Sequence, residues 1–463
     1  MSVPSPAHRR DVETLSKRTR PRVRLENFHV KGGEIVFEAS FDESVARYLR
    51  ATTLRFSYDV ALESVDPCFV VIPFVSTILT VAWALGADVE VPVLDKTFIE
   101  SAESIRKVMK SWYPRLSFRG EIRAHTTRSA AGTAGREGIL YSGGLDSTAS
   151  MLRHLDSRPV PMLVLGTPDL PTNHPEFLAM FLERVAPFVG QLGLKLHVIR
   201  SGMLEMVDLE TLNEDFGKAV GGYWWESISH GLMLLGSCAP VAAAEGVGIL
   251  RIAASRTEAF EEPWGSNPQV DEKLAWGGTR VVHDSYDLSR QQKIDSLIAP
   301  FLRGTKETIP LRACGSTKSK ERVVRKMLNC ERCEKCVRTI VGLLAGGVDP
   351  KACGFGMGYF SAESLRRGLE EGGLRLPKSV WDLWVDIQAS VRKQRPEEFP
   401  SMYDARPFFE WMRGYDLSRN LYKPSLATRV LKDSVPRFSE RQRSLELIRE
   451  FRRMSAQAPA EQE

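Results

Sequence analysis

The 463-residue chain lacks the two commonest nucleotide-binding motifs. It has no Gly-x-x-x-x-Gly-Lys-Ser/Thr loop, and no Gly-x-Gly-x-x-Gly follows a strand-like run, which argues against a Walker A NTPase and a Rossmann dinucleotide site. Arg9 and Arg10 are followed by charged residues and not by an apolar segment, so no secretory signal is expected. No internal repeat is found, which argues against a solenoid.

Cysteine is also scarce, and charge is nearly balanced. Three of the seven cysteines fall within seven residues, a spacing that favours metal binding in a reducing compartment, so we expect a cytoplasmic protein. The net charge of +5 over the whole chain does not by itself indicate nucleic-acid binding. Positive charge gathers between His8 and Arg24 and again after Arg392; we interpret both ends as solvated surface, with nucleic-acid contact as the alternative.

The chain is too long for one ordinary core, and two or three domains are expected. Changes in composition divide it as follows: 1–24 a disordered basic arm, 25–125 an N-terminal α/β module, 126–137 a flexible linker, 138–345 a parallel-sheet domain, 346–453 a helical C-terminal region, and 454–463 a disordered tail. Residues 30–41 and 52–62 alternate as half-buried strands do, and 98–111 reads as a helix.

Residues 68–87 are uncharged and long enough to cross a bilayer. The run contains Pro73, Ser76, Thr77 and Thr80, and a further strand-like run follows at 89–94. We therefore expect a buried strand at 68–74 and a helix at 75–87, and no membrane partner.

After residue 137, strand and helix patterns alternate with short loops. This indicates a parallel sheet covered on both faces, with ligands beyond the carboxyl ends of the strands. The expected strands are 138–141, 160–165, 194–200 and 247–254, and the expected helices are 147–155, 176–192 and 228–245.

The first of these strands runs into Ser-Gly-Gly-Leu-Asp-Ser, and a helix follows at once. Two glycines permit a sharp turn and close approach to a phosphate, and the helix N-terminus offers free N–H groups. Asp146 would either cap the helix or hold Mg²⁺ against the phosphates. The predicted phosphate loop consists of Ser142, Gly143, Gly144, Leu145, Asp146 and Ser147.

A cysteine cluster lies further along the chain. Cys330, Cys333 and Cys336 form two Cys-x-x-Cys steps, and Cys314 is the candidate fourth ligand of a zinc ion, with Cys353 as a substitute. An iron–sulfur cluster is the competing interpretation.

The loop and the cysteines, in this order, resemble the PP-loop (N-type) ATP pyrophosphatases, and within them the QueC-like, 7-cyano-7-deazaguanine synthase-like proteins. The resemblance covers about residues 138–344 and implies an adenine nucleotide alpha hydrolase-like fold for that domain. It also implies that ATP is split into AMP and pyrophosphate as a carboxylate is adenylated, and that a nitrogen nucleophile then attacks. ATP, Mg²⁺ and Zn²⁺ are the implied cofactors, and the substrate is a small-molecule or macromolecular carboxylate, with a protein or nucleic-acid acceptor left open.

Further candidates lie after the expected strands or, for Asp284, before an expected helix start at 288–293. Arg256 would neutralise phosphate charge, or is an ordinary surface arginine. Asp284 would be a second Mg²⁺ ligand or a general base, or else a cap or loop residue. Other polar or aromatic residues near the expected site are Asp169, His174, Glu258, His283, the 264–268 loop and the 223–225 aromatic run.

Two other functions remain open at this point. A PP-loop sulfurtransferase that delivers sulfur to a nucleobase, usually in tRNA, would need a catalytic cysteine near the loop, and Cys68 and Cys238 both lie in apolar runs. A non-catalytic, zinc-stabilised binding scaffold would tolerate a degenerate loop, whereas 142–147 is intact.

Overall fold

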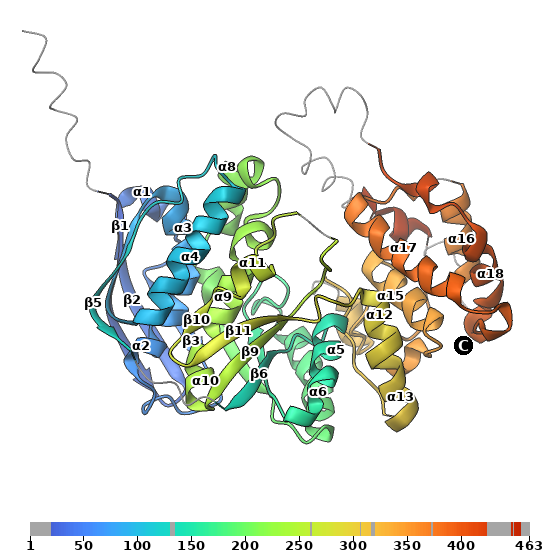
Figure 1. The fold of residues 1–463 in the computed structure, drawn as a ribbon, viewed down its shortest axis with the longest axis horizontal. Coiled ribbons are helices and arrows are strands. Elements are labelled where there is room, and N and C mark those ends of the chain that lie inside the picture. Colours follow the sequence, from blue (N-terminus) through green and yellow to red (C-terminus); the bar gives the residue numbers. More distant parts are fainter. Residues whose placement is uncertain are drawn as a thin grey trace, which may run out of the picture.

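An eleven-stranded sheet forms the centre of the protein in the computed structural model (Figure 1). The structure describes residues 20–129, 135–259, 262–305, 307–315, 320–371, 374–423, 446–447 and 449–454. The strands are β1 (Arg22–Lys31), β2 (Glu34–Phe41), β3 (Thr53–Ser57), β4 (Asp88–Asp95), β5 (Ile122–Arg128), β6 (Arg136–Leu140), β7 (Val160–Leu165), β8 (His197–Ser201), β9 (Val247–Ala253), β10 (Ala275–Trp276) and β11 (Thr279–Asp284). Their order in the sheet is β10-β11-β9-β6-β7-β8-β3-β2-β1-β4-β5.

The predicted parallel sheet is confirmed for β9, β6, β7 and β8, which run parallel to their neighbours in this order. β11, which was not predicted, adds a further parallel strand beside β9. Alternate residues of β7 enter two different cores: Met162 and Val164 pack on one face, and Leu163 and Leu165 on the other. Both faces are therefore covered, as the uninterrupted apolar run in this strand predicts. The covering helices are α5 (Leu145–Arg153) and α6 (Pro175–Gln191) on one face, and α9 (His230–Ser237) and α10 (Ala239–Ala244) on the other.

The N-terminal strands extend the same sheet. β3 pairs antiparallel with β8, and β1 pairs parallel with β4. The first described strand begins at Arg22, inside the range predicted as a disordered arm, and residues 1–19 lie outside the described residues. The predicted linker is also shorter than expected, because β5 continues to Arg128 and β6 begins at Arg136.

The strand predicted at 68–74 is wrong, because this segment is helical. It forms α2 (Pro67–Val70) and the start of α3 (Ile72–Leu85). The Asp66 side chain accepts a hydrogen bond from the Cys68 amide, and Pro67 at the first helical position fixes its φ, so a helix start is built into the sequence. Since nearly all of α3 is buried, its residues show no helical period, which is why sequence pattern alone did not separate helix from strand.

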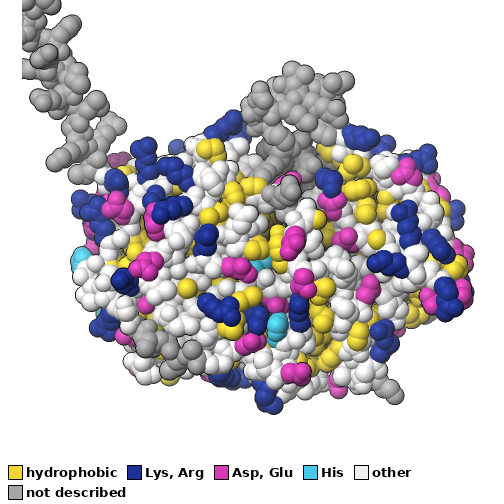
Figure 2. Space-filling view, viewed as in Figure 1, with side chains coloured by type: hydrophobic (Ala, Val, Ile, Leu, Met, Phe, Trp, Pro, Cys, Tyr) yellow, Lys and Arg dark blue, Asp and Glu magenta, His cyan; other side chains and the backbone are white. Residues whose placement is uncertain are grey.

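One helical stretch, Trp225–Ala244, is long and apolar enough to cross a membrane by length and composition. Its apolar window is 78% buried inside the protein, as in a core helix. On the face shown in Figure 2, Lys and Arg side chains are scattered among Asp and Glu, so this face presents no field of a single sign.

The C-terminal region is helical, as its composition predicts. Its helices pack onto the same core as α5 and α6 and lie at the far end of the molecule from β1 (Figure 1). The helices after β11 are α12 (Arg290–Lys293), α13 (Ala299–Thr305), α14 (Lys320–Val324), α15 (Glu334–Ala345), α16 (Ala362–Glu370), α17 (Lys378–Lys393) and α18 (Arg406–Gly414).

Candidate functional site

The loop between β6 and α5 is a tight turn held by its own serines. The Ser142 and Ser147 hydroxyls lie 3.1 Å apart, and Ser147 Oγ accepts from the Ser142 amide at 3.2 Å. Gly143 has a φ of +68°, and a Cβ there would lie 2.9 Å from the Phe181 ring, so only glycine fits. Gly144 is the N-cap of α5 and has no capping side chain, which leaves the first turn of the helix open to a ligand.

Asp146 does not cap α5; it forms ion pairs with two cations. Arg290 Nη2 lies 2.5 Å from one carboxylate oxygen, and Lys293 Nζ lies 3.4 Å from the other. Lys293 is only 1% exposed, and its ammonium also donates to the Ala254 carbonyl. Burial alone would raise the pKa of Asp146, but the charges of Arg290 and Lys293 outweigh it and hold that pKa at about 2.

A cavity of about 320 Å³ opens beside this loop, and we call it the loop cavity. It lies where the carboxyl ends of β6, β7 and β9 meet, as expected for a parallel sheet. Its walls combine apolar strand ends, such as Leu163, Val164 and Ile252, with polar groups. The polar and charged residues that line it include Ser142, Asp146, Ser147, Thr167, Asp169, Glu226, His230, Ser266, Arg312 and Lys335.

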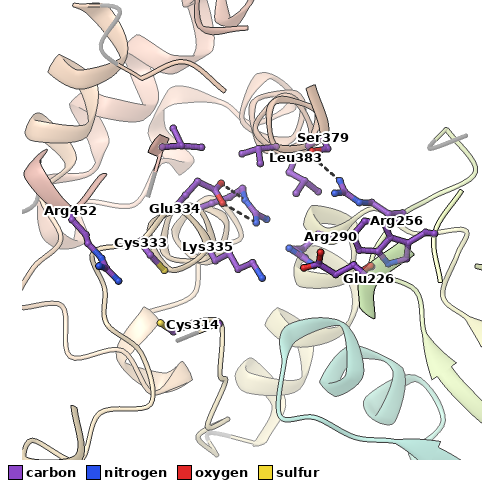
Figure 3. Close-up of a pocket in the computed structure, with 16 residues that line it drawn as sticks. Glu226, Arg256, Arg290, Cys314, Cys333, Glu334, Lys335, Ser379, Leu383 and Arg452 are labelled. Atoms are coloured by element: carbon purple, nitrogen blue, oxygen red, sulfur yellow. Dashed lines mark hydrogen bonds and ion pairs between the residues drawn. The ribbon is translucent and has the colours of Figure 1, made fainter. Parts of the chain in front are cut away.

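A second cavity of about 560 Å³ is shown in Figure 3, and we call it the basic chamber. It shares part of its wall with the loop cavity. Glu226, Trp264, Gly315 and Lys335 line both. The chamber carries more cations than carboxylates, so it favours an anionic ligand. Its charged residues are Arg256, Arg290, Lys335, Arg338 and Arg452, against Glu226 and Glu334.

Glu226 stands where the two cavities meet. It belongs to a π-helical turn, Trp225–Ser229, a distortion that is frequent at functional sites. No described residue forms a hydrogen bond or ion pair with its carboxylate. Burial raises the pKa of Glu226 to about 7, against the nearby positive charge of Lys335.

The four predicted cysteines come together. The Sγ atoms of Cys314, Cys330, Cys333 and Cys336 all lie within 4.8 Å of one another, and those of Cys330 and Cys336 are 3.8 Å apart. A tetrahedral zinc site with bonds of about 2.3 Å needs sulfurs roughly 3.8 Å apart, so the cluster fits such an ion. Cys353 is buried and outside the cluster. Because Cys314 lines both cavities, a bound metal ion would lie directly behind their common wall.

The structure does not bring Asp284 to either cavity. Its carboxylate accepts hydrogen bonds from Ser150 at 2.6 Å and from Ser285 at 2.8 Å, and it lies 2.8 Å from His154 Nε2. It ends β11, a strand that the sequence analysis did not predict, and it is turned toward the far end of α5. A role as Mg²⁺ ligand or general base therefore has no geometric support.

Arg256 lines the basic chamber and not the loop cavity. Its Nη1 donates to the Ser379 carbonyl at 2.6 Å, and burial lowers its pKa to about 10. Among the other predicted residues, Asp169, Trp225, Trp264 and Ser266 line the loop cavity, whereas His174, Tyr223, Glu258 and His283 line neither cavity. His283 instead pairs with buried Asp271, Nδ1 to Oδ2 at 2.8 Å.

The sequence analysis missed the residues that contribute most to the charge of the site. Arg290 and Lys293 lie on α12, where the capping box of Ser289 and Gln292 was the readable signal. Arg312 and Lys335 are close in sequence to cysteines of the cluster, but nothing in their spacing pointed to the loop.

Comparison with family models, with curated proteins and with solved structures found no match to this chain. The protein is therefore defined by its own architecture: an α/β protein with a large, mostly parallel sheet and four cysteines that are placed to hold a metal ion.

Proposed function

We propose that the protein is a PP-loop enzyme that uses ATP to adenylate a carboxylate, releases pyrophosphate, and then transfers the acyl group to a nitrogen nucleophile. The observation that carries this proposal is the open loop at 142–147, which lines a cavity that shares part of its wall with a second, basic chamber. Two joined compartments suit a reaction in which one substrate is activated by another.

The loop cavity has the size and lining that a nucleotide needs. Its volume lies within the range of small-molecule sites, and its apolar strand ends suit a purine ring. Loop N–H groups, Ser142 and Ser147 would bind phosphate oxygens, and Arg290 would neutralise charge that develops in the transition state. In this arrangement Asp146 is a positioning residue, since it holds Arg290 and Lys293 at the loop.

The residues around the loop are less suited to Mg²⁺ than to a nucleotide. Asp146, the carboxylate of the loop, is already paired with two cations. Magnesium prefers carboxylate oxygens without such competitors, so the residues as they stand do not form a magnesium site on the loop, and we derive no step through this ion.

Glu226 supplies the base that the second step requires. When the nitrogen attacks the acyl carbon, a C–N bond forms, the bond from that carbon to the AMP oxygen breaks, and the nitrogen loses a proton. A carboxylate with a pKa of about 7 at the junction of the cavities is matched to accept that proton near neutral pH. The basic chamber would bind the carboxylate substrate beside it.

The alternatives receive less support from the geometry. Cys68 and Cys238 are fully buried, and burial raises both pKa values, so neither is a suitable sulfur carrier. The cysteines that line the cavities belong to the cluster. A binding scaffold without catalysis would not need a carboxylate such as Glu226, with its raised pKa, between two cavities.

The test is to incubate the protein with ATP, Mg²⁺, ammonia and a panel of acids that includes 7-carboxy-7-deazaguanine, and to follow AMP, pyrophosphate and product mass. Gly143→Ala should abolish pyrophosphate release, because a Cβ at Gly143 collides with Phe181. Gly190→Ala is the matched control, since a Cβ there meets nothing within 4 Å. Absence of ATP binding by the unmodified protein would refute the proposal.

A further inference from the structure

Arg312 is a buried cation without a counterion. Its residue exposure is 9%, and it forms no ion pair with any residue in the described part of the chain. Nη1 donates to the carbonyls of Asp169 at 3.3 Å and Cys314 at 3.1 Å, while Nε is buried and has no partner. A buried guanidinium normally has a carboxylate or another anion as its partner, because leaving water is costly.

The position of Arg312 indicates which kind of anion it would bind. It lines the loop cavity, and its backbone N–H donates to the Gly143 carbonyl at 2.7 Å, so it is fixed to the turn that would bind phosphate. The planar fork of an arginine with unused N–H donors matches the oxygens of a phosphate group.

The same segment is tied to the cysteine cluster. Buried Asn329 accepts from the amides of Ala313 at 2.8 Å and Cys314 at 3.2 Å, and it donates to the Leu311 carbonyl at 2.8 Å. Arg312 is thus clamped between the phosphate loop on one side and a metal-ligand segment on the other. Because Asn329 directly precedes Cys330 in the chain, these hydrogen bonds to residues 311–314 depend on how the cysteine cluster is folded.

We infer that Arg312 is a phosphate-binding residue of the loop cavity and that the metal-bound cysteine cluster holds it in place. The inference rests on the proposed function, because it takes the phosphate to be that of ATP. It assigns the metal a role in nucleotide affinity in addition to fold stability.

The test compares the binding of ATP, inorganic pyrophosphate and adenosine by calorimetry, without turnover. Arg312→Gln should weaken ATP and pyrophosphate by about 10- to 100-fold, the usual effect of one charge-assisted hydrogen-bonding group, and leave adenosine unchanged. Arg184→Gln, on the exposed face of α6, is the control and should change none of the three. If Arg312→Gln does not fold, Arg312→Lys should also weaken ATP and pyrophosphate but not adenosine, by smaller factors than expected for Arg312→Gln.

Asn329→Asp tests the link to the cluster, because it keeps the acceptor oxygen and removes the donor to Leu311. It should retain its metal, measured by mass spectrometry, and still lose about 3- to 10-fold in ATP affinity. Unchanged ATP affinity in a metal-loaded Asn329→Asp would overturn the link. Equal losses of ATP and adenosine in the Arg312 variants, or no loss of ATP, would overturn the phosphate role. If the unmodified protein binds neither ATP nor adenosine, the proposed function fails first and this inference with it.

Discussion

Replacing Asp146 with asparagine removes the carboxylate that pairs with a buried lysine and a partly buried arginine. Arg290 and Lys293 both pair with it, and Lys293 has no other acidic partner within 4 Å among the described residues. Asparagine keeps the shape of the side chain, so the change isolates the charge. We expect the variant to fold but to be clearly less stable at neutral pH.

Two lines of reasoning give the magnitude. The fall of the Asp146 pKa from 3.8 to about 2 corresponds to about 2 kcal/mol of stability at neutral pH. Leaving a buried charge without its partner costs about 3–5 kcal/mol in other proteins. The expected loss is therefore about 2–5 kcal/mol, and burial will favour loss of the Lys293 proton once Asp146 is gone.

The free energy of unfolding in urea measures this loss. Because the folded pKa of Asp146 is depressed, its contribution is complete above its unfolded pKa of 3.8 and disappears as pH falls through about 2, so wild type and variant should converge in acid. Lys293→Met in the Asp146→Asn background should recover part of the loss. Asp287→Asn removes an exposed partner of Arg153 and is the control, with at most about 1 kcal/mol expected. A loss below about 1 kcal/mol for Asp146→Asn would refute the reasoning.

Two further predictions concern the cysteine cluster and Glu226. Cys333→Ser should lose its bound metal, measured as metal content, and on the order of 10 kcal/mol of folding free energy, measured by thermal unfolding. Cys353→Ser is the control and should keep the metal, and a metal-free Cys333→Ser of full stability would exclude a structural ion. If the proposed function holds, nitrogen transfer should increase as pH rises through about 7, because Glu226 must lose its proton to act as a base, and Glu226→Gln should remove both this rise and most of the rate. A pH profile that Glu226→Gln leaves unchanged would assign the base to another group.

The parts of the fold that were predictable from the sequence are those with a strong local signal. The strand at 160–165 was predicted at its observed bounds, because its apolar run has the length of a strand and is flanked by Pro159 and Gly166. The run at 68–74 was wrongly predicted as a strand, because α3 is buried on all sides and its sequence therefore has no amphipathic period. β11, with the sequence Thr-Arg-Val-Val-His-Asp, is short and carries charge, and only its place beside β9 makes it a strand.

The candidate site was predictable in part for the same reason. The Ser-Gly-Gly-Leu-Asp-Ser loop and the cysteine cluster are local motifs that can be read from the sequence, and the structure brings the four predicted cysteines together. Glu226, Lys293 and Arg312 come from three separate segments, and their proximity to the loop is a property of the tertiary fold. No spacing rule links them in the sequence, whereas Asp284, a candidate from the sequence, lines neither cavity.

The continuous sheet also gives the N-terminal module a place in the site. Tyr113 Oη donates to the Ser227 carbonyl at 3.0 Å, and Thr80 Oγ1 lies 3.2 Å from Ser229 Oγ, so two of its side chains bond to the π-helical turn that carries Glu226. A π-helical turn is a rare departure from the α-helix that is frequent at functional sites. Both bonds are buried, where a hydrogen bond is electrostatically stronger than in water. The module therefore supports the backbone and a side chain of the π-helical turn that carries Glu226, without lining either cavity itself.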